Sequence, residues 1–144
     1  MQKEFIEFIK EHHILTICTC KESLSWCASC FYAYDEKNTL LIFSSDEKTK
    51  HANMMRENPN ISGTIALETK EIGLIQGMQF SGIVSKASSN SKKLYFKTYP
   101  YAIALIPTLW QIEINYAKLT NNRLGFGKKL EFNSPKYKNL ELFY

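Results

Sequence analysis

The chain has 144 residues, of which 44% are hydrophobic and 22% charged, and its formal net charge is +4. This length fits one domain with a single core, and no apolar run approaches the about 20 residues of a membrane-spanning helix. The composition excludes membrane, fibrous, disordered and disulfide-scaffold proteins. Because the N-terminal segment lacks the apolar block of a signal peptide, we expect a cytoplasmic protein whose four cysteines are thiols.

Positive charge is concentrated in the second half of the chain. Residues 1–72 hold 8 Lys/Arg and 11 Asp/Glu, whereas residues 73–144 hold 10 Lys/Arg and 3 Asp/Glu. A basic half is typical of proteins that bind nucleic acid, an anionic surface or a phosphorylated ligand. The lysines are scattered without a long block of like charge, which favours a solvated basic face.

The hydrophobic pattern predicts an α+β chain that is mainly β, with about three short helices. Phe5, Ile6, Phe8 and Ile9 form the apolar stripe of a first helix over about residues 2–12. Helix caps and proline stops predict two more helices, at 47–57 and 91–98. The strand-like segments, rich in β-branched or alternating apolar residues, are 14–20, 24–34, 39–45, 61–67, 71–85, 109–115 and 117–120.

Short turns and repeated glycines predict how these strands assemble. The first three strands form an antiparallel meander joined by short hairpins. Gly73, Gly77 and Gly82 indicate bends or bulges in the fifth strand, as in a sheet that curls into a barrel. We therefore expect a small closed β-barrel over residues 1–132, followed by a polar C-terminal tail over 133–144.

Four cysteines lie on two adjacent predicted strands. The spacing Cys18-x-Cys20 and Cys27-x-x-Cys30 is compatible with a four-sulfur metal site. However, Cys27 and Cys30 are three residues apart and point to opposite faces of a strand, so four thiolates cannot converge on one ion. We expect no metal site and place the cysteines in the core.

The junction between the third strand and the second helix carries the most informative cluster of polar residues. Free backbone N–H groups at a helix start, together with hydroxyl and ammonium groups, suit a phosphate dianion. The alternative is that Ser45 and Asp46 only cap the helix while the lysines face water. The candidate ligand groups at this junction are those of Ser44, Ser45, Lys48, Thr49, Lys50 and His51.

The order and spacing of these residues define a resemblance. Ser44-Ser45, then Thr49-Lys50-His51-Ala52, then Asn58-Pro59 resemble patterns of the pyridoxamine 5'-phosphate oxidase-like FMN-binding split barrels. The run 76–82 resembles a Gln/Arg-rich strand of that superfamily. Within it, Trp26-Cys27-Ala28 and the run Leu-Gly-Phe-Gly-Lys-Lys are similar to a small bacterial subgroup, the YhbP type. The resemblance covers about residues 5–130.

The resemblance implies a six-stranded antiparallel Greek-key split β-barrel that forms a homodimer, with FMN in each of two clefts between the subunits. Residues 49–51 would face the FMN phosphate, and the strand 27–32 would lie along the isoalloxazine. Gln79 would approach from the longer strand, and Trp110 would pack near the ring from the partner subunit. The residues implied to bind the cofactor are Ser29, Cys30, Ser44, Ser45, Lys48, Thr49, Lys50, His51, Gln79 and Trp110.

Departures from the oxidase pattern bear on the activity. The oxidase has Arg and Lys where this chain carries Cys27 and Tyr32, and its C-terminal Arg-x-His-x-Arg stretch has no counterpart here. Lys50 replaces an arginine, which removes a bidentate fork. We therefore expect an FMN-dependent oxidoreductase that is not pyridoxamine-phosphate oxidase and whose substrate the sequence does not identify, with Trp110, Tyr32 and His51 on the substrate side.

Two further classes of function stay open. One is a non-catalytic ligand-binding barrel, because the superfamily includes heme-binding relatives, with His12, His13 or His51 as candidate heme ligands. The other, ranked last, is a barrel that binds single-stranded nucleic acid through the basic half and exposed aromatic side chains. The aromatic residues considered for that role are Tyr95, Phe96, Tyr99 and Tyr101.

Overall fold

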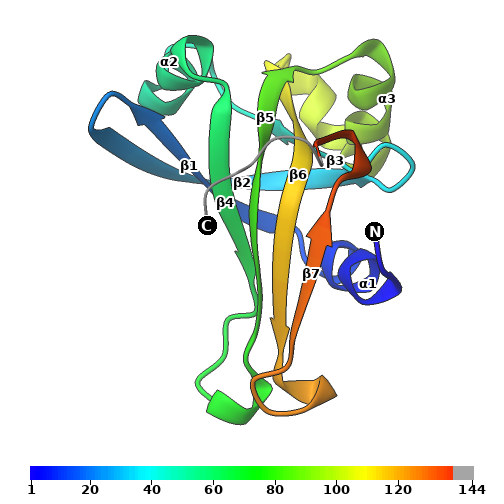
Figure 1. The fold of residues 1–144 in the computed structure, drawn as a ribbon. Coiled ribbons are helices and arrows are strands. Elements are labelled where there is room, and N and C mark those ends of the chain that lie inside the picture. The colour runs from blue at the N-terminus through cyan, green and yellow to red at the C-terminus, as the bar shows by residue number, and fades with distance from the viewer. Residues whose placement is uncertain (138–144) are drawn as a thin grey trace.

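The computed structural model describes residues 1–137 of the chain, and seven strands lie within them. The strands are β1 (Ile14–Lys21), β2 (Leu24–Asp35), β3 (Leu40–Ser44), β4 (Asn60–Ala66), β5 (Gln76–Lys86), β6 (Leu109–Asn121) and β7 (Lys129–Asn133). They form one antiparallel sheet in the order β3-β2-β1-β4-β5-β6-β7, and β3 also pairs with β6. This additional pairing closes the first six strands of the described chain into a barrel (Figure 1).

The expected six-stranded Greek-key barrel is confirmed. β1, β2 and β3 form a meander, and β4 returns to lie beside β1, which is the Greek-key order. The two strands expected at 109–115 and 117–120 are one continuous strand, β6. β7 was not predicted, and it pairs with the second half of β6 outside the ring. Residues 138–144 of the expected tail lie outside the described residues, so the boundary at residue 132 stays a prediction.

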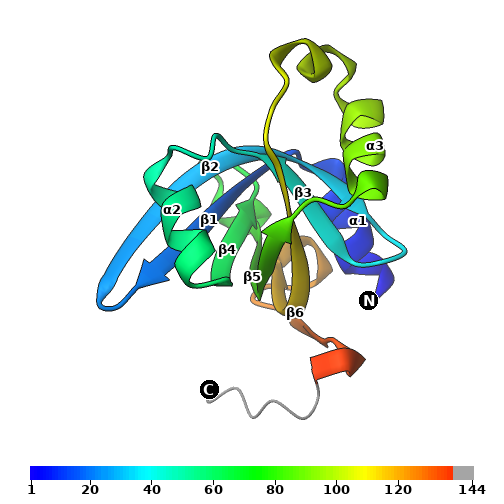
Figure 2. The ribbon, with the colours of Figure 1, turned by 90° about the horizontal axis from the view of Figure 1, so that it is seen from above.

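The three expected α-helices are also confirmed within residues 1–137. They are α1 (Lys3–Glu11), α2 (Lys50–Glu57) and α3 (Ser89–Thr98). α3 and the segment after it project from one side of the barrel (Figure 2). Across the described part of the chain, every helix is too short or too polar to traverse a bilayer.

The barrel interior holds the main hydrophobic core, and α1 packs against it. Phe5, Phe8 and Ile9 of α1 are buried, and the Tyr32 hydroxyl donates a hydrogen bond to the Ile9 carbonyl at 2.6 Å. Each large apolar side chain buried in this way contributes roughly 1.5–3 kcal/mol. A second, smaller cluster under α3 includes Tyr95 and joins that helix to β2 and β3.

The glycine pattern of β5 has the expected structural consequence at one position. The pairing of β5 with β6 shifts register between Ser81 and Gly82, so the expected bulge is confirmed there. A Cβ atom at Gly82 would lie 2.5 Å from the Glu113 carbonyl oxygen and 2.8 Å from Cγ2 of Ile112. The close approach of β6 therefore requires glycine at this position.

Gly82→Ala should destabilise the barrel. The clash is with backbone, which yields little, so we expect a loss of about 1–3 kcal/mol in the free energy of unfolding. Gly77→Ala in the same strand is the matched control, because its nearest neighbour would be the Ile65 carbonyl oxygen at 3.8 Å. Urea denaturation measures both variants, and equal stabilities would contradict this account of the bulge.

Candidate functional site

The candidate site begins where β3 ends, at a point held by the closing strand of the barrel. Phe43 pairs with Trp110 across the β3–β6 ladder. Beyond it, the Ser45 amide donates to the Thr108 carbonyl at 3.0 Å, and the Trp110 indole N–H donates to the Ser45 carbonyl at 3.0 Å. These bonds fix the backbone of Ser45, and the residue is only 7% exposed. The seryl hydroxyl therefore has a defined position beside α2.

Thr49 caps α2. Its Oγ1 accepts a hydrogen bond from the Ala52 amide at 3.3 Å and donates to the Asp46 carbonyl at 2.8 Å. The Asp46 carboxylate accepts from the Lys48 amide at 2.7 Å and so closes the preceding turn. The alternative in which Ser45 and Asp46 cap the helix is therefore wrong, and the Ser45 side chain makes another contact.

That contact joins Ser45 to Thr49 and His51 in a compact polar cluster. Ser45 Oγ lies 2.5 Å from His51 Nε2, and Thr49 Oγ1 lies 3.2 Å from both Ser45 Oγ and His51 Nε2. Burial lowers the pKa of the His51 imidazole, which keeps the ring neutral at pH 7. The cluster sits at the first turn of α2, where backbone amides lack intrahelical partners and the helix dipole is positive.

Two lysines add positive charge to this end of α2. Lys50 Nζ lies 4.2 Å from the centroid of the Trp26 ring, on the neighbouring strand β2. Lys86, by contrast, pairs with Glu47 and covers the Trp110 ring. Within residues 1–137, neither Lys48 nor Lys50 takes part in an ion pair. Their charge is therefore available to an anion.

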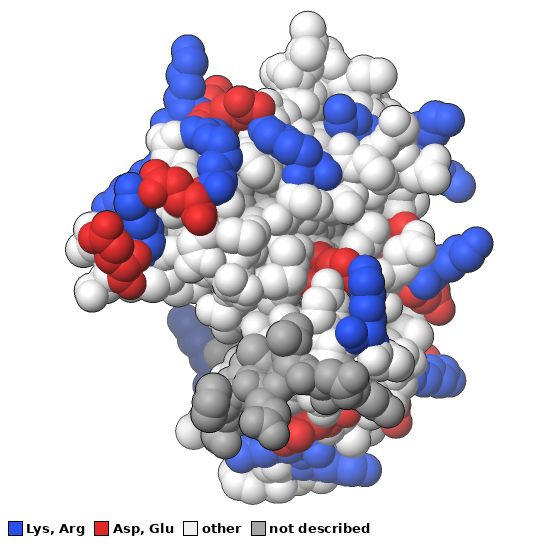
Figure 3. Space-filling view, turned by 45° about the horizontal axis from the view of Figure 1, so that its top comes forward, with Lys and Arg blue, Asp and Glu red and all other residues white. Residues whose placement is uncertain are grey.

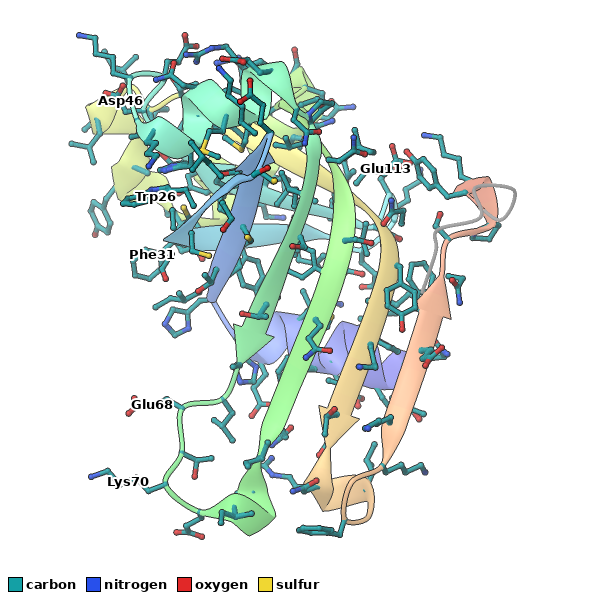
Figure 4. The ribbon with its side chains drawn as sticks, turned by 60° about the vertical axis from the view of Figure 1, so that its left-hand side comes forward. Trp26, Phe31, Asp46, Glu68, Lys70 and Glu113 are labelled. Atoms are coloured by element: carbon teal, nitrogen blue, oxygen red, sulfur yellow. The ribbon has the colours of Figure 1, made fainter. Side chains whose placement is uncertain are left out.

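Three more of the residues predicted to bind the cofactor line one cavity beside β2. Ser29, Cys30 and Ser44 line an open cavity of about 410 Å³. Trp26 and Phe31 project from β2 on the same side of the molecule, with Asp46 above them (Figure 4). The cavity lining is completed by Ile14, Phe31 and Tyr95.

The sequence did not identify Trp26 or Tyr95 as site residues. Each reaches the site through tertiary packing, because Trp26 meets Lys50 of α2 and Tyr95 arrives on α3. The available signal for Trp26 was its place in the motif Trp26-Cys27-Ala28, directly before the strand that the resemblance placed along the ring. Tyr95 was considered only for nucleic-acid binding, and nothing in the sequence placed it beside β2.

Gln79 lies apart from this cluster. It lines a second cavity, of about 470 Å³, on the outer face of β1, β4, β5 and β6, which reaches β2 at Cys27. β1 and β4 separate its strand from β2 in the sheet, which puts Gln79 about 14 Å from Ser29 at the usual strand spacing. One subunit therefore does not bring Gln79 to the start of α2.

The two large aromatic residues expected on the substrate side are buried. Tyr32 is 3% exposed and its hydroxyl is bound to the Ile9 carbonyl, so its placement at the substrate is wrong. Burial raises the pKa of Tyr32 above its ordinary range. Trp110 is also 3% exposed, and what it contacts at the site is the Ser45 carbonyl. Trp110 thus positions Ser45 within this subunit.

None of the four cysteines is fully buried in the core, although Cys30 packs against it. Cys20 and Cys27 are exposed, because the end of the β1–β2 hairpin extends beyond the part of β2 that pairs with β3, and Cys18 and Cys30 are half-buried. Burial raises the pKa of the Cys30 thiol to about 11. No group of three or more potential metal ligands comes together within residues 1–137.

The surface gives little support to a nucleic-acid interface. Tyr95 is buried, and Phe96 and Tyr99 pack with it under α3, which leaves Tyr101 as the exposed aromatic side chain of the four considered. Figure 3 shows acidic and basic side chains interspersed over one end of the face in view, with uncharged surface in the middle. Single strands need stacked aromatic platforms in a basic groove, and these residues do not form one.

Comparison with known proteins identifies the family. No family model matches the chain. UPF0306 proteins of Yersinia pseudotuberculosis and Yersinia pestis are 37% identical to it over 129 residues, which cover 87% of this chain and 88% of theirs. The chain belongs to the UPF0306 family.

Several solved structures share the fold of this UPF0306 protein. A heme binding protein from Mycobacterium smegmatis has a TM-score of 0.74 at 12% identity, over 88% of this chain and 55% of that one. A NimC/NimA family protein from Clostridium acetobutylicum has a TM-score of 0.69 at 14% identity, over 92% of this chain and 91% of that one. An FAD-binding protein from Mesorhizobium loti has a TM-score of 0.67 at 13% identity, over 79% of this chain and 87% of that one.

His51 should make the stability of the protein depend on pH in a defined direction. Its pKa is lowered in the folded state, so the unfolded chain takes up the proton first as the pH falls through about 6.5. The free energy of unfolding should therefore decrease as the pH falls from about 7 to about 5. In the His51→Gln variant, which lacks this imidazole, the free energy of unfolding should change less over the same pH range. Urea unfolding at both pH values tests this, and an identical pH dependence in the two proteins would contradict it.

Proposed function

We propose that this UPF0306 protein is a homodimeric FMN-binding flavoprotein and a flavin-dependent oxidoreductase, of the YhbP type. The observation that carries the proposal is the cluster of Ser45, Thr49 and His51 at the start of α2, beside Lys48 and Lys50. The four thiols are free, which suits the reducing cytoplasm where we place the protein.

The cluster fits a phosphate monoester. Three side chains lie within hydrogen-bonding distance of one another at the first amides of α2. Lys48 and Lys50 adjoin them in the chain, and neither takes part in an ion pair within residues 1–137. His51 is neutral in the free protein, so only one of its ring nitrogens carries a proton. A bound dianion would favour the protonated imidazole, in which both ring nitrogens are hydrogen-bond donors. Lys48 and Lys50 would then compensate the remaining charge.

The cavity along β2 fits a planar ring system next to that phosphate. It is about 410 Å³ in volume, which is within the range of small-molecule sites. Ser29 and Ser44 supply hydroxyl groups, and the Ile14, Phe31 and Tyr95 side chains supply an apolar wall. When bound, FMN would supply hydride or electron chemistry. The residues of this chain would bind it, orient it along β2 and exclude water from one of its faces.

A second subunit would complete the site. Gln79 is remote from α2 within one chain, so its expected contact with the cofactor requires the partner. The segment after α3 offers an apolar surface for that association, since Tyr101, Leu105 and Ile106 are 94%, 81% and 89% exposed. Phe31 lines both the β2 cavity and a neighbouring cavity formed with Leu105. The interface would therefore border the cofactor site.

Removal of the phosphate ligands should weaken FMN binding. Lys50→Ala and Thr49→Ala each delete a group that would bind the phosphate, and a hydrogen bond to a charged group contributes about 1.5–3 kcal/mol. We expect the Kd for FMN, measured by quenching of flavin fluorescence, to rise roughly ten- to hundredfold. Lys92→Ala, which removes an exposed lysine from α3, is the matched control. An unchanged Kd in Lys50→Ala would contradict the phosphate site.

A heme-binding module is the second candidate, and His13 is the residue that favours it. Its ring stacks on Phe31, with centroids 5.7 Å apart and an interplanar angle of 18°, at the edge of the β2 cavity. His12 is less available, because its Nδ1 lies 2.9 Å from the Phe8 carbonyl oxygen. Binding of hemin but not of FMN in the same titration, with loss of the heme absorbance band in His13→Ala, would replace the flavin proposal with this one.

Association through the segment after α3 should be sensitive to charge. Leu105→Asp places a carboxylate in the apolar surface, and burial of an unpaired charge is strongly unfavourable. We expect this variant to be monomeric by light scattering under conditions in which the wild type is dimeric. Leu24→Asp, at a leucine 65% exposed on the β1–β2 hairpin, should stay dimeric. A dimeric Leu105→Asp variant would exclude this surface as the interface.

A further inference from the structure

A pair of cysteines faces across the β1–β2 hairpin in the cavity that Gln79 also lines, and the proposed function gives neither thiol a role. Cys18 and Cys27 are directly opposed in the antiparallel register, and both line the cavity of about 470 Å³. In the adjacent row, Thr16 Oγ1 and Ser29 Oγ are 3.0 Å apart, so side chains on this face meet across the two strands. Opposed residues in such a ladder have Cα atoms about 4.5–5.5 Å apart, within the range that a disulfide bridges.

The other two cysteines have no comparable partner. Cys20 is opposite Ser25, and Cys30 is opposite Leu15. Cys20 and Cys27 are diagonal neighbours, about 7–8 Å apart in a regular ladder, which is beyond the reach of a disulfide without movement of the backbone. The register therefore selects one pair among the four thiols.

We propose that Cys18 and Cys27 form a redox-active dithiol that reduces low-molecular-weight disulfides and is itself oxidised to a cross-strand disulfide. The proposal goes beyond the function proposed above because it requires no flavin. In cytoplasmic proteins, disulfides that do form are mostly transient and catalytic or redox-sensing.

The reaction has two balanced steps. The Cys27 thiolate attacks one sulfur of the external disulfide and forms a mixed disulfide with it, while the external S–S bond breaks and the other half leaves as a thiolate. Cys18 then loses its proton to solvent and attacks Cys27 Sγ, which displaces the second thiolate and forms the Cys18–Cys27 bond. In sum, two protein thiols are oxidised and one external disulfide is reduced to two thiols.

Exposure fixes the order of these steps. Cys27 is exposed and meets the external disulfide first, whereas Cys18 is half-buried beside it. Burial, and next the hydrogen bond to Cys27, raise the pKa of the Cys18 thiol. Cys18 therefore stays protonated at pH 7 until the mixed disulfide brings an electrophilic sulfur next to it, which suits the resolving thiol.

The cavity around the pair indicates what the external disulfide carries. Ser62 is opposite Cys18, and Ser81 is opposite Ser62, so hydroxyl groups continue the row away from the thiols. In the next row Gln79 is opposite Lys118, and in the described part of the chain Lys118 has no ion pair. Hydroxyl, amide and ammonium groups suit a peptide-like disulfide with carboxylates. Glutathione disulfide is the corresponding probe.

The test is to incubate the reduced full-length protein, free of flavin, with glutathione disulfide. Remaining thiols are then alkylated and the peptides are mapped by mass spectrometry. We expect a Cys18–Cys27 disulfide as the main product, release of both halves of the probe as glutathione, and reversal by dithiothreitol. Stable glutathione adducts without an internal bond, or an internal bond between other cysteines, would overturn the proposal.

Two serine variants separate the roles of the thiols. Cys18→Ser should accumulate the glutathione adduct on Cys27, because the resolving thiol is gone. Cys20→Ser is the matched control, since it removes an exposed cysteine from the same strand, and it should yield as much internal disulfide as the wild type. Loss of the disulfide in Cys20→Ser would overturn the assignment. Because the proposal is tested without flavin, its failure leaves the FMN proposal unaffected, and the reverse also holds.

Discussion

The antiparallel pairing of β3 with β6 is the constraint on which the rest of the structure depends. It closes the barrel, and it ends where the candidate site begins. The Trp110 indole, buried in the core and paired with Phe43, donates to the Ser45 carbonyl and so holds the residue that leads into α2. Because Ser45 is fixed, its hydroxyl meets Thr49 and His51 instead of solvent. The hydrogen bond from Trp110 to the Ser45 carbonyl therefore connects the hydrophobic core to the candidate site.

The site is assembled from elements with different roles. The start of α2 contributes backbone amides, its capping residue Thr49 and two lysines, whereas β2 contributes a strand with Trp26 and Phe31 projecting on one side. The contact of Lys50 with Trp26 joins these two parts. A cation held over an aromatic ring keeps its charge while losing freedom of movement, so it is prepared for an anion. Under the proposed function, this arrangement would let Lys50 act where the resemblance has an arginine.

Much of the fold was predictable from local pattern. β-branched runs, the helix caps and the Asn58-Pro59 stop located the helices and most strands, and Gly82 indicated the bulge in β5. β7 was missed although its residues alternate between polar and apolar, because it has only five of them, and its pairing with β6 is what makes it a strand. The cysteines were misplaced because sequence alone does not show where β2 leaves the closed part of the barrel.

For the site, the sequence identified the residues of the β3–α2 junction but not their bonds. Ser45, Thr49 and His51 were candidates, yet which of them caps α2 depended on the turn at Asp46. The burial of Tyr32 and Trp110, and the distance of Gln79 from α2, are consequences of how the barrel closes. Tyr95 of the β2 cavity comes from α3, far along the chain. Such contacts arise from tertiary structure and leave no local pattern.

The most direct test of the phosphate site compares FMN with riboflavin, which has the same ring system without the phosphate. Isothermal titration calorimetry of the wild-type protein gives both affinities under one set of conditions. If the cluster at the start of α2 binds the phosphate, FMN should bind at least about tenfold more tightly than riboflavin. Equal affinities for the two flavins, or no binding of FMN, would contradict the account.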